Sequence, residues 1–449
     1  MSKFLRSGSL ERYLSRTQKS RHIWEESKKL IPDGVFRNWY FFKPYPFYVV
    51  RAEGSRIYDV DGNEYIDFCN NAGSLILGHA HPRVVSAIKS VIEKGLLSSI
   101  GPTELDFKYA EMIHRANPCA EKIRVTTSGT EAVMYATRLA RAYTRKNKIA
   151  KFEGQYSGSS DFIYFSVTPT IDSPLPPTPV LDSEGIPSTV TDYQISLPWN
   201  DIHTTENIIK KERKNLAAVI VDPCMRAITP PEKDFLKALR EVTSENDILL
   251  IADEVASGFR LSYRGAYGYF GLVPDIVVYG KIAGGGFPLG VFASNEEIIS
   301  LVCSEGGKVR VPHSGTFSGH PFAIEAGYAT LCELYEHPEI YDRINIFGNR
   351  IRKGLSEIFE DNKLDAIVGG YASIFRIFFT EKKLIMSYRD IADSVKRLEE
   401  AFRLELISRG IYMSVWSNLS AAITKDDVEL MLEAAGNAIR SVRYEHAPF

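Results

Sequence analysis

The chain has 449 residues, 44% of them hydrophobic and 24% charged, a composition typical of a globular protein with a large core. Lys and Arg number 54 against 56 Asp and Glu, and this net charge of -2 argues against a partner that is nucleic acid or an anionic membrane. The five cysteines are far apart and show no C-x-x-C spacing, which predicts reduced thiols in a cytoplasmic protein and no metal site.

The N-terminal residues Met1–Arg6 lead into polar sequence, so we expect no export signal, and no later stretch is apolar enough to span a membrane. A helical pattern from Ser20 to Lys29 ends at the proline and glycine of 31–34, and an aromatic-rich loop follows. A small antiparallel sheet is then predicted from short β-rich runs at 48–52, 56–60 and 65–68.

Beyond about residue 85, short apolar runs alternate with helical patterns, which predicts an α/β domain with a mostly parallel sheet. The clearest strands are at 123–126, 217–221, 248–252 and 276–279. A polar residue or glycine follows each strand, and ligands of such sheets bind beyond the carboxyl ends of the strands. The Pro-, Ser- and Thr-rich segment 169–192 predicts a loop over this surface, either a mobile lid or inert surface.

After about residue 323 the pattern becomes helical again, at 324–335 and in the charged run 390–408, with short strands between. This predicts a smaller α+β domain. The expected division is an N-terminal segment that contributes to the small domain, a large cofactor-binding domain and a C-terminal small domain, at 1–84, 85–325 and 326–449.

Two residues at predicted strand ends carry the chemistry. Lys281 leaves the buried run 275–280, and a desolvated lysine there has a lowered pKa and can form a Schiff base; the alternative is a solvated lysine at a strand end. Asp253 ends the run 248–252, where its carboxylate can pair with a pyridine nitrogen, or can cap a helix. The 28 residues between them allow one helix and a return to the adjoining parallel strand, so both can face one crevice.

A phosphate site is predicted where a strand meets a helix at 127–131, because the free N–H groups and dipole of a helix N-terminus attract anions. The alternative there is an ordinary helix cap. The segment matches neither a G-x-x-x-x-G-K-S/T loop nor G-x-G-x-x-G, so a monophosphate is favoured over a nucleotide. Tyr156, between two glycines, can stack on a flat heteroaromatic ligand or be a half-buried core residue.

From about Ile31 to the C-terminal region these segments resemble class III aminotransferases of the pyridoxal 5'-phosphate (PLP) fold type I, most closely the glutamate-1-semialdehyde aminomutase-like branch. The matching segments are 58–62 (YDVDG), 77–82 (LGHAHP), 128–132 (SGTEA), 253–255 (DEV) with 258–260 (GFR), 280–281 (GK) with 284–286 (GGG), and 315–321 (GTFSGHP). The resemblance implies a seven-stranded, mostly parallel sheet in the large domain.

The resemblance also implies roles for individual residues. Lys281 would be the Schiff-base lysine and Asp253 the partner of the pyridinium. Tyr156 would stack on the cofactor ring. The remaining cofactor residues would be Ser128, Gly129, Thr130, Val255 and Thr316, the last reaching the phosphate bound by the other subunit, so that the active site lies at the interface of a homodimer.

The substrate positions depart from the family. Its asparagine near the cofactor hydroxyl falls at Ala227, and its carboxylate-binding arginine falls at Tyr40, with Arg37 close enough to substitute. The histidine usual after the stacking tyrosine is Ser157, and an expected glutamate is replaced around 414–416. Four consecutive aromatics suggest either an entrance for a cyclic or apolar substrate or dimer packing: Trp39, Tyr40, Phe41 and Phe42.

The cofactor residues of the family are retained, whereas the residues expected to contact the substrate differ. This combination favours a PLP-dependent aminotransferase that moves an amino group from a donor to a carbonyl acceptor by a ping-pong mechanism. An intramolecular aminomutase of the glutamate-1-semialdehyde type is the first alternative. A non-catalytic relative that only binds PLP or a phosphate ligand is the second, because fold alone does not establish activity.

Overall fold

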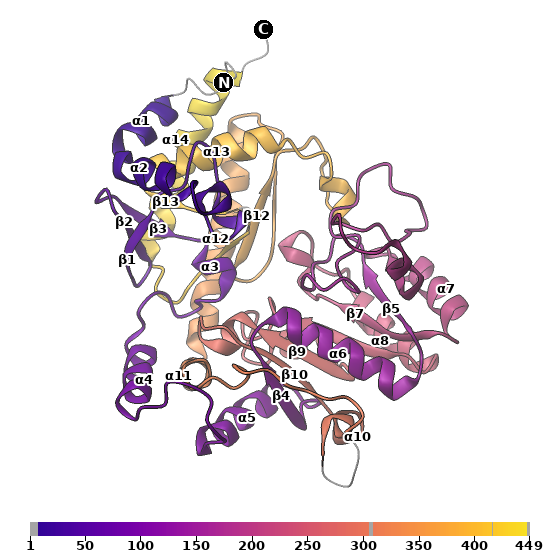
Figure 1. Cartoon of the computed structure of the whole chain (residues 1–449). Coiled ribbons are helices and arrows are strands. Elements are labelled where there is room, and N and C mark those ends of the chain that lie inside the picture. Colours follow the sequence, from indigo (N-terminus) through magenta and orange to yellow (C-terminus); the bar gives the residue numbers. More distant parts are fainter. Residues whose placement is uncertain (1–7, 305–308, 415, 447–449) are drawn as a thin grey trace.

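The computed structural model describes residues 8–304, 309–414 and 416–446. Met1–Arg6, and Val415 of the segment 414–416, lie outside those ranges. A large domain built on one sheet lies beside a small domain made from both ends of the chain (Figure 1). The boundaries at residues 84 and 325 remain a prediction. Among the described helices, none is both long and apolar enough to cross a membrane.

The central sheet has seven strands, as the resemblance predicts, and only β10 runs against the others. The predicted strands at 123–126, 217–221, 248–252 and 276–279 are confirmed as β4, β7, β8 and β9. In spatial order the strands are β4 (Lys122–Thr126), β10 (Gly290–Ser294), β9 (Ile276–Gly280), β8 (Leu249–Glu254), β7 (Leu216–Val221), β5 (Lys148–Phe152) and β6 (Gln194–Leu197).

Helices cover both faces of this sheet, which explains why its strands read as continuous apolar runs. Alternate residues along a strand face opposite sides, so Ile220 and Val278 pack with α6 in one cluster, whereas Val221 and Tyr279 pack in another with α5, α8 and α11. The large-domain helices are α4 (Pro82–Glu93), α5 (Glu104–Ala116), α6 (Gly129–Thr144), α7 (Ile202–Glu212), α8 (Phe235–Glu245), α9 (Gly265–Phe270), α10 (Glu296–Ile299) and α11 (Pro321–Glu336).

The small domain joins sequence from both ends of the chain. The predicted meander is confirmed as β1 (Val49–Glu53), β2 (Arg56–Asp59) and β3 (Glu64–Asp67), and β13 (Ile411–Tyr412) pairs with β3 in parallel. A second sheet contains β11 (Ile367–Gly369), β12 (Ile374–Phe378) and β14 (Ser417–Asn418). The helices are α1 (Gly8–Arg16), α2 (Gln18–Ser27), α3 (Asn70–Gly73), α12 (Glu339–Asp361), α13 (Lys396–Ser408) and α14 (Lys425–His446).

Short 3₁₀ turns connect these elements. They are η2 (Pro32–Gly34), η3 (Asn38–Tyr40), η4 (Ser188–Tyr193), η5 (Met225–Ala227), η6 (Lys281–Gly284), η7 (Ser300–Val302) and η8 (Tyr388–Ile391). The prediction of a helix from residue 390 is wrong in its start, because α13 begins at Lys396. The Asp390 carboxylate accepts the backbone N–H groups of Met386 and Ser387, which closes η8 as a separate capped turn.

The segment 169–192 is an irregular loop, as predicted, and contacts hold it along its length. Asp182 accepts hydrogen bonds from the backbone N–H groups of Val167 and Thr168, at 2.6 and 3.0 Å. Arg389 of η8 donates to the Ser173 and Pro174 carbonyls, at 2.6 and 2.7 Å. The loop is therefore fastened to the small domain as well as to the large one.

Arg260 connects the two domains from a fully buried position. Its guanidinium donates to the Leu419 carbonyl at 2.5 Å and to the Gly73 carbonyl at 2.7 Å. Burial lowers the pKa of Arg260 to about 10, so it stays charged at neutral pH. Its partners are backbone carbonyls from distant parts of the small domain, and losing the guanidinium leaves both carbonyls buried without a donor.

Replacing Arg260 by methionine should therefore lower the free energy of unfolding by about 3 kcal/mol, the cost of unsatisfied buried polar groups. Equilibrium urea denaturation measures the change. Arg350→Met is the matched control, because its ion pair with Glu429 is exposed and should be worth less than about 0.5 kcal/mol. Equal effects of the two substitutions would contradict the assignment of Arg260 as a connection between the domains.

Candidate active site

Lys281 and Asp253 leave neighbouring parallel strands at the same edge of the sheet, as the spacing of 28 residues predicts. Asp253 lies in β8 opposite Val278 of β9, and Lys281 follows β9 directly. The alternative role of Asp253 as a helix cap is wrong, because β8 continues through Glu254 and the next helix begins at Gly265. The Lys281 side chain is not directed freely into solvent, since its Nζ lies 4.2 Å from the ring centroid of Trp416.

At this edge of the sheet the amine of Lys281 and the carboxyl groups of Asp222 and Asp253 shift one another's pKa. Burial lowers the pKa of Lys281, and the carboxylates of Asp222 and Asp253 oppose that shift. Burial, followed by the charge of Asp222, raises the pKa of Asp253 to about 7, while the Ser157 hydroxyl and the Val255 N–H lower it. The raised pKa indicates that few positive groups stabilise the Asp253 carboxylate. Groups with perturbed pKa values cluster at functional sites.

The turn between β4 and α6 forms a narrow cradle of backbone. The Ser128 side chain caps α6 by accepting the Glu131 N–H at 3.2 Å. The alternative prediction for 127–131, an ordinary helix cap, is therefore confirmed for the Ser128 side chain. A Cβ on Gly129 would lie 2.8 Å from the Val255 side chain, and a Cβ on Gly158 would lie 2.8 Å from the hydroxyl of Thr130. Glycine at both positions therefore lets these side chains approach the backbone more closely than a Cβ would allow, beside the free N–H groups of a helix N-terminus.

Tyr156 stands beside this cradle. Its ring is 43% exposed, so it is not a core residue, and its hydroxyl hydrogen-bonds with Thr130. Tyr164 and Tyr156 form a T-shaped pair, with ring centroids 6.1 Å apart, which helps to hold the Tyr156 ring. A partly exposed ring of this kind can stack on a planar ligand.

The substrate residues suggested by the sequence are only partly brought together. Arg37 stacks on the Tyr40 ring at 4.1 Å, hydrogen-bonds its hydroxyl and donates to Asn71 at 3.0 Å. Trp39 and Tyr40 are 40% and 41% exposed, as an entrance requires. Phe42 does not belong to such an entrance, because it is buried in the small-domain core, where it packs against Tyr13.

Three residues that sequence reasoning did not assign also face this edge: Asp222, Arg226 and Trp416. Asp222 follows β7 directly and accepts the N–H groups of Cys224 and Arg226. The rule that polar residues follow the strands would have found it. Trp416 comes from the far end of the chain, and no local pattern indicates that it lies over Lys281. Thr316, by contrast, is exposed on the surface of this chain.

These residues fit PLP. The buried Asp253 offers an acceptor for a protonated ring nitrogen, the cradle at Gly129 and Gly158 offers N–H groups for a phosphate, and Tyr156 offers a stacking face. Lys281 offers an amine whose pKa burial lowers, as a Schiff-base lysine requires. One edge of the sheet therefore presents the four functions that the resemblance implies.

Comparison with known proteins points the same way. The sequence profile of the family described as "Aminotransferase class-III" matches residues 42–388. Glutamate-1-semialdehyde 2,1-aminomutase of Methanosarcina acetivorans is 41% identical over 425 residues, which cover 93% of this chain and 97% of that protein. A solved omega-transaminase from Sphaerobacter thermophilus superposes with a TM-score of 0.89 at 34% identity, over 96% of this chain and 99% of the other. A transaminase with PLP bound gives a TM-score of 0.88 at 32% identity, over the same shares of the two chains. The predicted PLP fold type I is confirmed.

Proposed function

This chain belongs to the class III aminotransferase family, and on that premise we propose that it moves an amino group within a small amino-carbonyl compound, as a 2,1-aminomutase. PLP is its cofactor. The observation that carries the proposal is the 41% identity to an archaeal glutamate-1-semialdehyde 2,1-aminomutase over nearly the full length of both chains. The comparisons thus favour the aminomutase over the aminotransferase that the altered substrate shell led us to expect.

Transamination between two molecules is the second candidate. It is supported by Ala227 and Tyr40, which replace an asparagine and an arginine of the aminomutases, and by the 34% identity to the omega-transaminase. Both reactions use the same cofactor residues. An aminomutase moves the amino group within one molecule, whereas a transaminase passes it to a separate carbonyl acceptor. The residues that contact the substrate therefore decide between the two reactions.

The cofactor, when bound, supplies a carbonyl that condenses with amines and a ring that withdraws electrons from the substrate's α-carbon. Lys281 would hold the cofactor, and its Nζ, which burial helps to keep neutral, would move a proton at the substrate carbon. The Asp253 carboxylate would accept a hydrogen bond from the ring nitrogen and keep that atom protonated. Ser157 supports the charged form of this carboxylate in place of the family's histidine.

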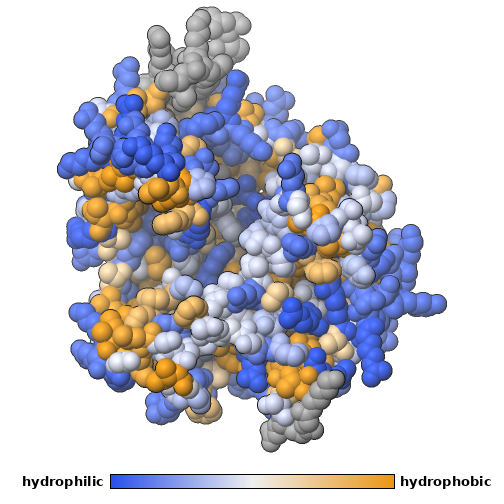
Figure 2. All heavy atoms as spheres, in the orientation of Figure 1, coloured by the Kyte–Doolittle hydropathy of each residue, from blue (hydrophilic) through white to orange (hydrophobic). Residues whose placement is uncertain are grey.

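A homodimer is part of the proposal, with Thr316 reaching the phosphate site of the partner. It is supported by an apolar surface around α4 and α5, visible at the lower left of Figure 2. Exposed side chains there include Ile92 at 54%, Leu97 at 60%, Ile100 at 84% and Phe107 at 66%. Contiguous exposed apolar surface of this kind marks association sites.

The test is to incubate PLP-loaded enzyme with glutamate 1-semialdehyde alone, and separately with amino donors plus a keto acid, and to identify products by mass spectrometry. Isomerisation of the single substrate without a keto acid is the expected result. Amino transfer that needs the keto acid would replace the aminomutase with the second candidate. No reaction in either mixture, with the cofactor bound, would contradict both and leave a non-catalytic PLP-binding relative.

A further inference from the structure

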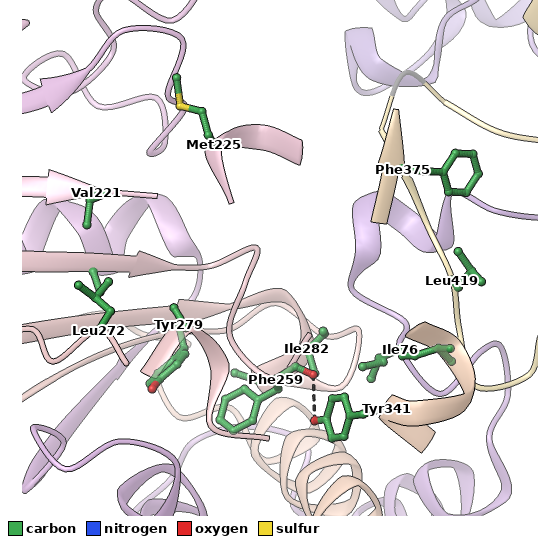
Figure 3. Close-up of a cluster of buried hydrophobic side chains, with 14 of the residues drawn as sticks. Ile76, Val221, Met225, Phe259, Leu272, Tyr279, Ile282, Tyr341, Phe375 and Leu419 are labelled. Carbon is green, nitrogen blue, oxygen red and sulfur yellow. Dashed lines mark hydrogen bonds between the residues drawn. The ribbon is translucent and has the colours of Figure 1, made fainter. Parts of the chain in front are cut away.

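Two arginines from different domains face each other beside the candidate active site. Arg226 lies in η5, directly after β7, and Arg376 lies in the middle of β12. Figure 3 shows Phe375 of β12 pointing away from η5. Because side chains alternate along a strand, Arg376 points the other way, toward η5. Its neighbours on that face agree, since Ile374 packs with Ala227 and Phe378 with Ile228.

Arg376 is a charged group that has no hydrogen-bond partner among the described residues. Its guanidinium makes no hydrogen bond or ion pair with any described residue, and its Nε is buried and unsatisfied. The Phe378 ring lies 4.8 Å from the guanidinium. Burial and the positive charge of Arg226 together lower the pKa of Arg376 to about 10, while the charge of Glu399 opposes the shift. A cation held this way is costly unless an anion joins it.

Arg226 is anchored through only one of its nitrogens. Nη1 donates to the carbonyls of Gly154 and Val167, at 3.1 and 2.9 Å, and the guanidinium lies 5.5 Å from the Tyr388 ring centroid. Its Nε and Nη2 make no hydrogen bond with the described part of the chain. The charge of Arg226 also lowers the pKa of Tyr156, so it lies within electrostatic reach of the cofactor-stacking ring.

Among the described residues, none of the nearby carboxylates forms a hydrogen bond with either guanidinium, although the charge of Glu399 attracts Arg376. Glu153 pairs with Arg389 at 2.8 Å, Asp222 accepts two backbone N–H groups, and Glu399 accepts the Ser394 hydroxyl at 2.8 Å. A third unsatisfied donor lies in the same region, because the buried Nε1 of Trp416 has no partner among described residues, and this indole packs in the cluster of Ala227 and Ile374.

We propose that Arg226 and Arg376 together bind a carboxylate of the substrate, with the Trp416 N–H as a further donor. Two guanidinium groups match the planar geometry of a carboxylate, and binding it satisfies donors that are otherwise unpaired. This inference rests on the proposed function, and it names the substrate class as a carboxylate-bearing amino compound. It also explains how Tyr40 can replace the family's carboxylate-binding arginine, because recognition moves to the face between η5 and β12. Figure 2 shows the molecule hollowed between its two domains on this side.

The test measures binding of succinate, a simple dicarboxylate, to PLP-loaded enzyme by isothermal titration calorimetry. Arg226→Gln and Arg376→Gln should each raise the dissociation constant at least about tenfold, and Arg226→Lys by less. Arg350→Gln, far from the site, should leave it unchanged. The affinity for PLP should stay within about twofold in all variants. A loss of PLP affinity instead would place these arginines at the cofactor phosphate and overturn the proposal.

A second readout separates binding from a structural role. Arg376→Leu should leave the melting temperature of the enzyme without succinate unchanged or higher, because removing a buried guanidinium that lacks hydrogen bonds offsets the lost attraction to Glu399, yet weaken succinate binding. A residue that only supports the fold would lower both. Unchanged succinate affinity in the glutamine variants, or no saturable binding by the wild type up to about 50 mM, overturns the subsite. Succinate binding needs no turnover, so an enzyme that binds it through these arginines but catalyses neither reaction would refute the proposed function alone.

Discussion

Replacing Lys281 by alanine should lower kcat about 10⁴-fold, because the same amine holds the cofactor and moves the proton. Lys281 leaves β9 at the edge of the sheet where Asp253 lies one strand away. Steady-state turnover of the substrate identified by the product analysis measures the loss. The visible absorption band of PLP-loaded enzyme should change in parallel, which reports the lost covalent attachment without turnover.

Lys237→Ala is the control for the loss of a lysine, because that side chain is 75% exposed on α8 and should leave both readouts unchanged. Circular dichroism and the melting temperature establish that the Lys281 variant is folded. A folded Lys281 variant that keeps more than about a tenth of the wild-type kcat would refute the catalytic role of this lysine.

Replacing Asp253 by asparagine should lower kcat on the order of 10³-fold with little change in side-chain volume. The buried carboxylate is the group placed to keep the cofactor's ring nitrogen protonated, and an amide cannot supply that charge. Asp222→Asn is the informative comparison, because Asp222 is equally buried but accepts two backbone N–H groups, whereas Asp253 accepts one among the described residues. We expect the kcat of the Asp222 variant to fall by less than about tenfold. A larger loss for the Asp222 variant than for the Asp253 variant would assign the ring nitrogen to Asp222 instead.

The pKa of Asp253 also predicts a pH dependence with a definite sign. Its folded value of about 7 lies above its ordinary value of 3.8, so its contribution to stability is complete below the ordinary value and is lost as the pH rises through about 7. Without cofactor, a buried carboxylate is left unpaired above that pH. The rise in melting temperature on adding PLP should therefore be larger at about pH 8 than at about pH 6, and Asp253→Asn should remove most of that difference.

Much of the cofactor edge could be predicted because its residues follow strongly patterned strands. The apolar runs before Asp253 and Lys281 locate β8 and β9, and one right-handed crossover between them makes the strands neighbours. The bounds differ by one or two residues, since β8 runs from Leu249 to Glu254 and β9 continues through Gly280. The cap at Ser128 could be predicted for the same reason, because its partner Glu131 is three residues away.

The substrate side could not be predicted in this way, because it is assembled from unrelated parts of the chain. Arg226 lies in η5, Arg376 in β12 and Trp416 in the bend before β14, and their proximity depends on how β12 packs against η5. Phe42 shows the converse error. Its aromatic neighbours suggested a shared entrance, but the backbone turns after η3 and buries it with Tyr13. Local composition does not reveal which side of a loop faces the core.

The pairing of β3 with β13 has a consequence for how the chain is made. Ile66 of β3 lies opposite Ile411 of β13. Strand β3 is therefore synthesised early, and the strand it pairs with is synthesised only near the end of translation. Until then β3 presents an open edge, and the Arg260 guanidinium lacks its acceptor at Leu419. The large domain can bury its sheet beforehand, whereas the small domain must close after translation is nearly complete. Nascent chains that stop short of residue 411 are therefore the species most exposed to aggregation and to chaperones.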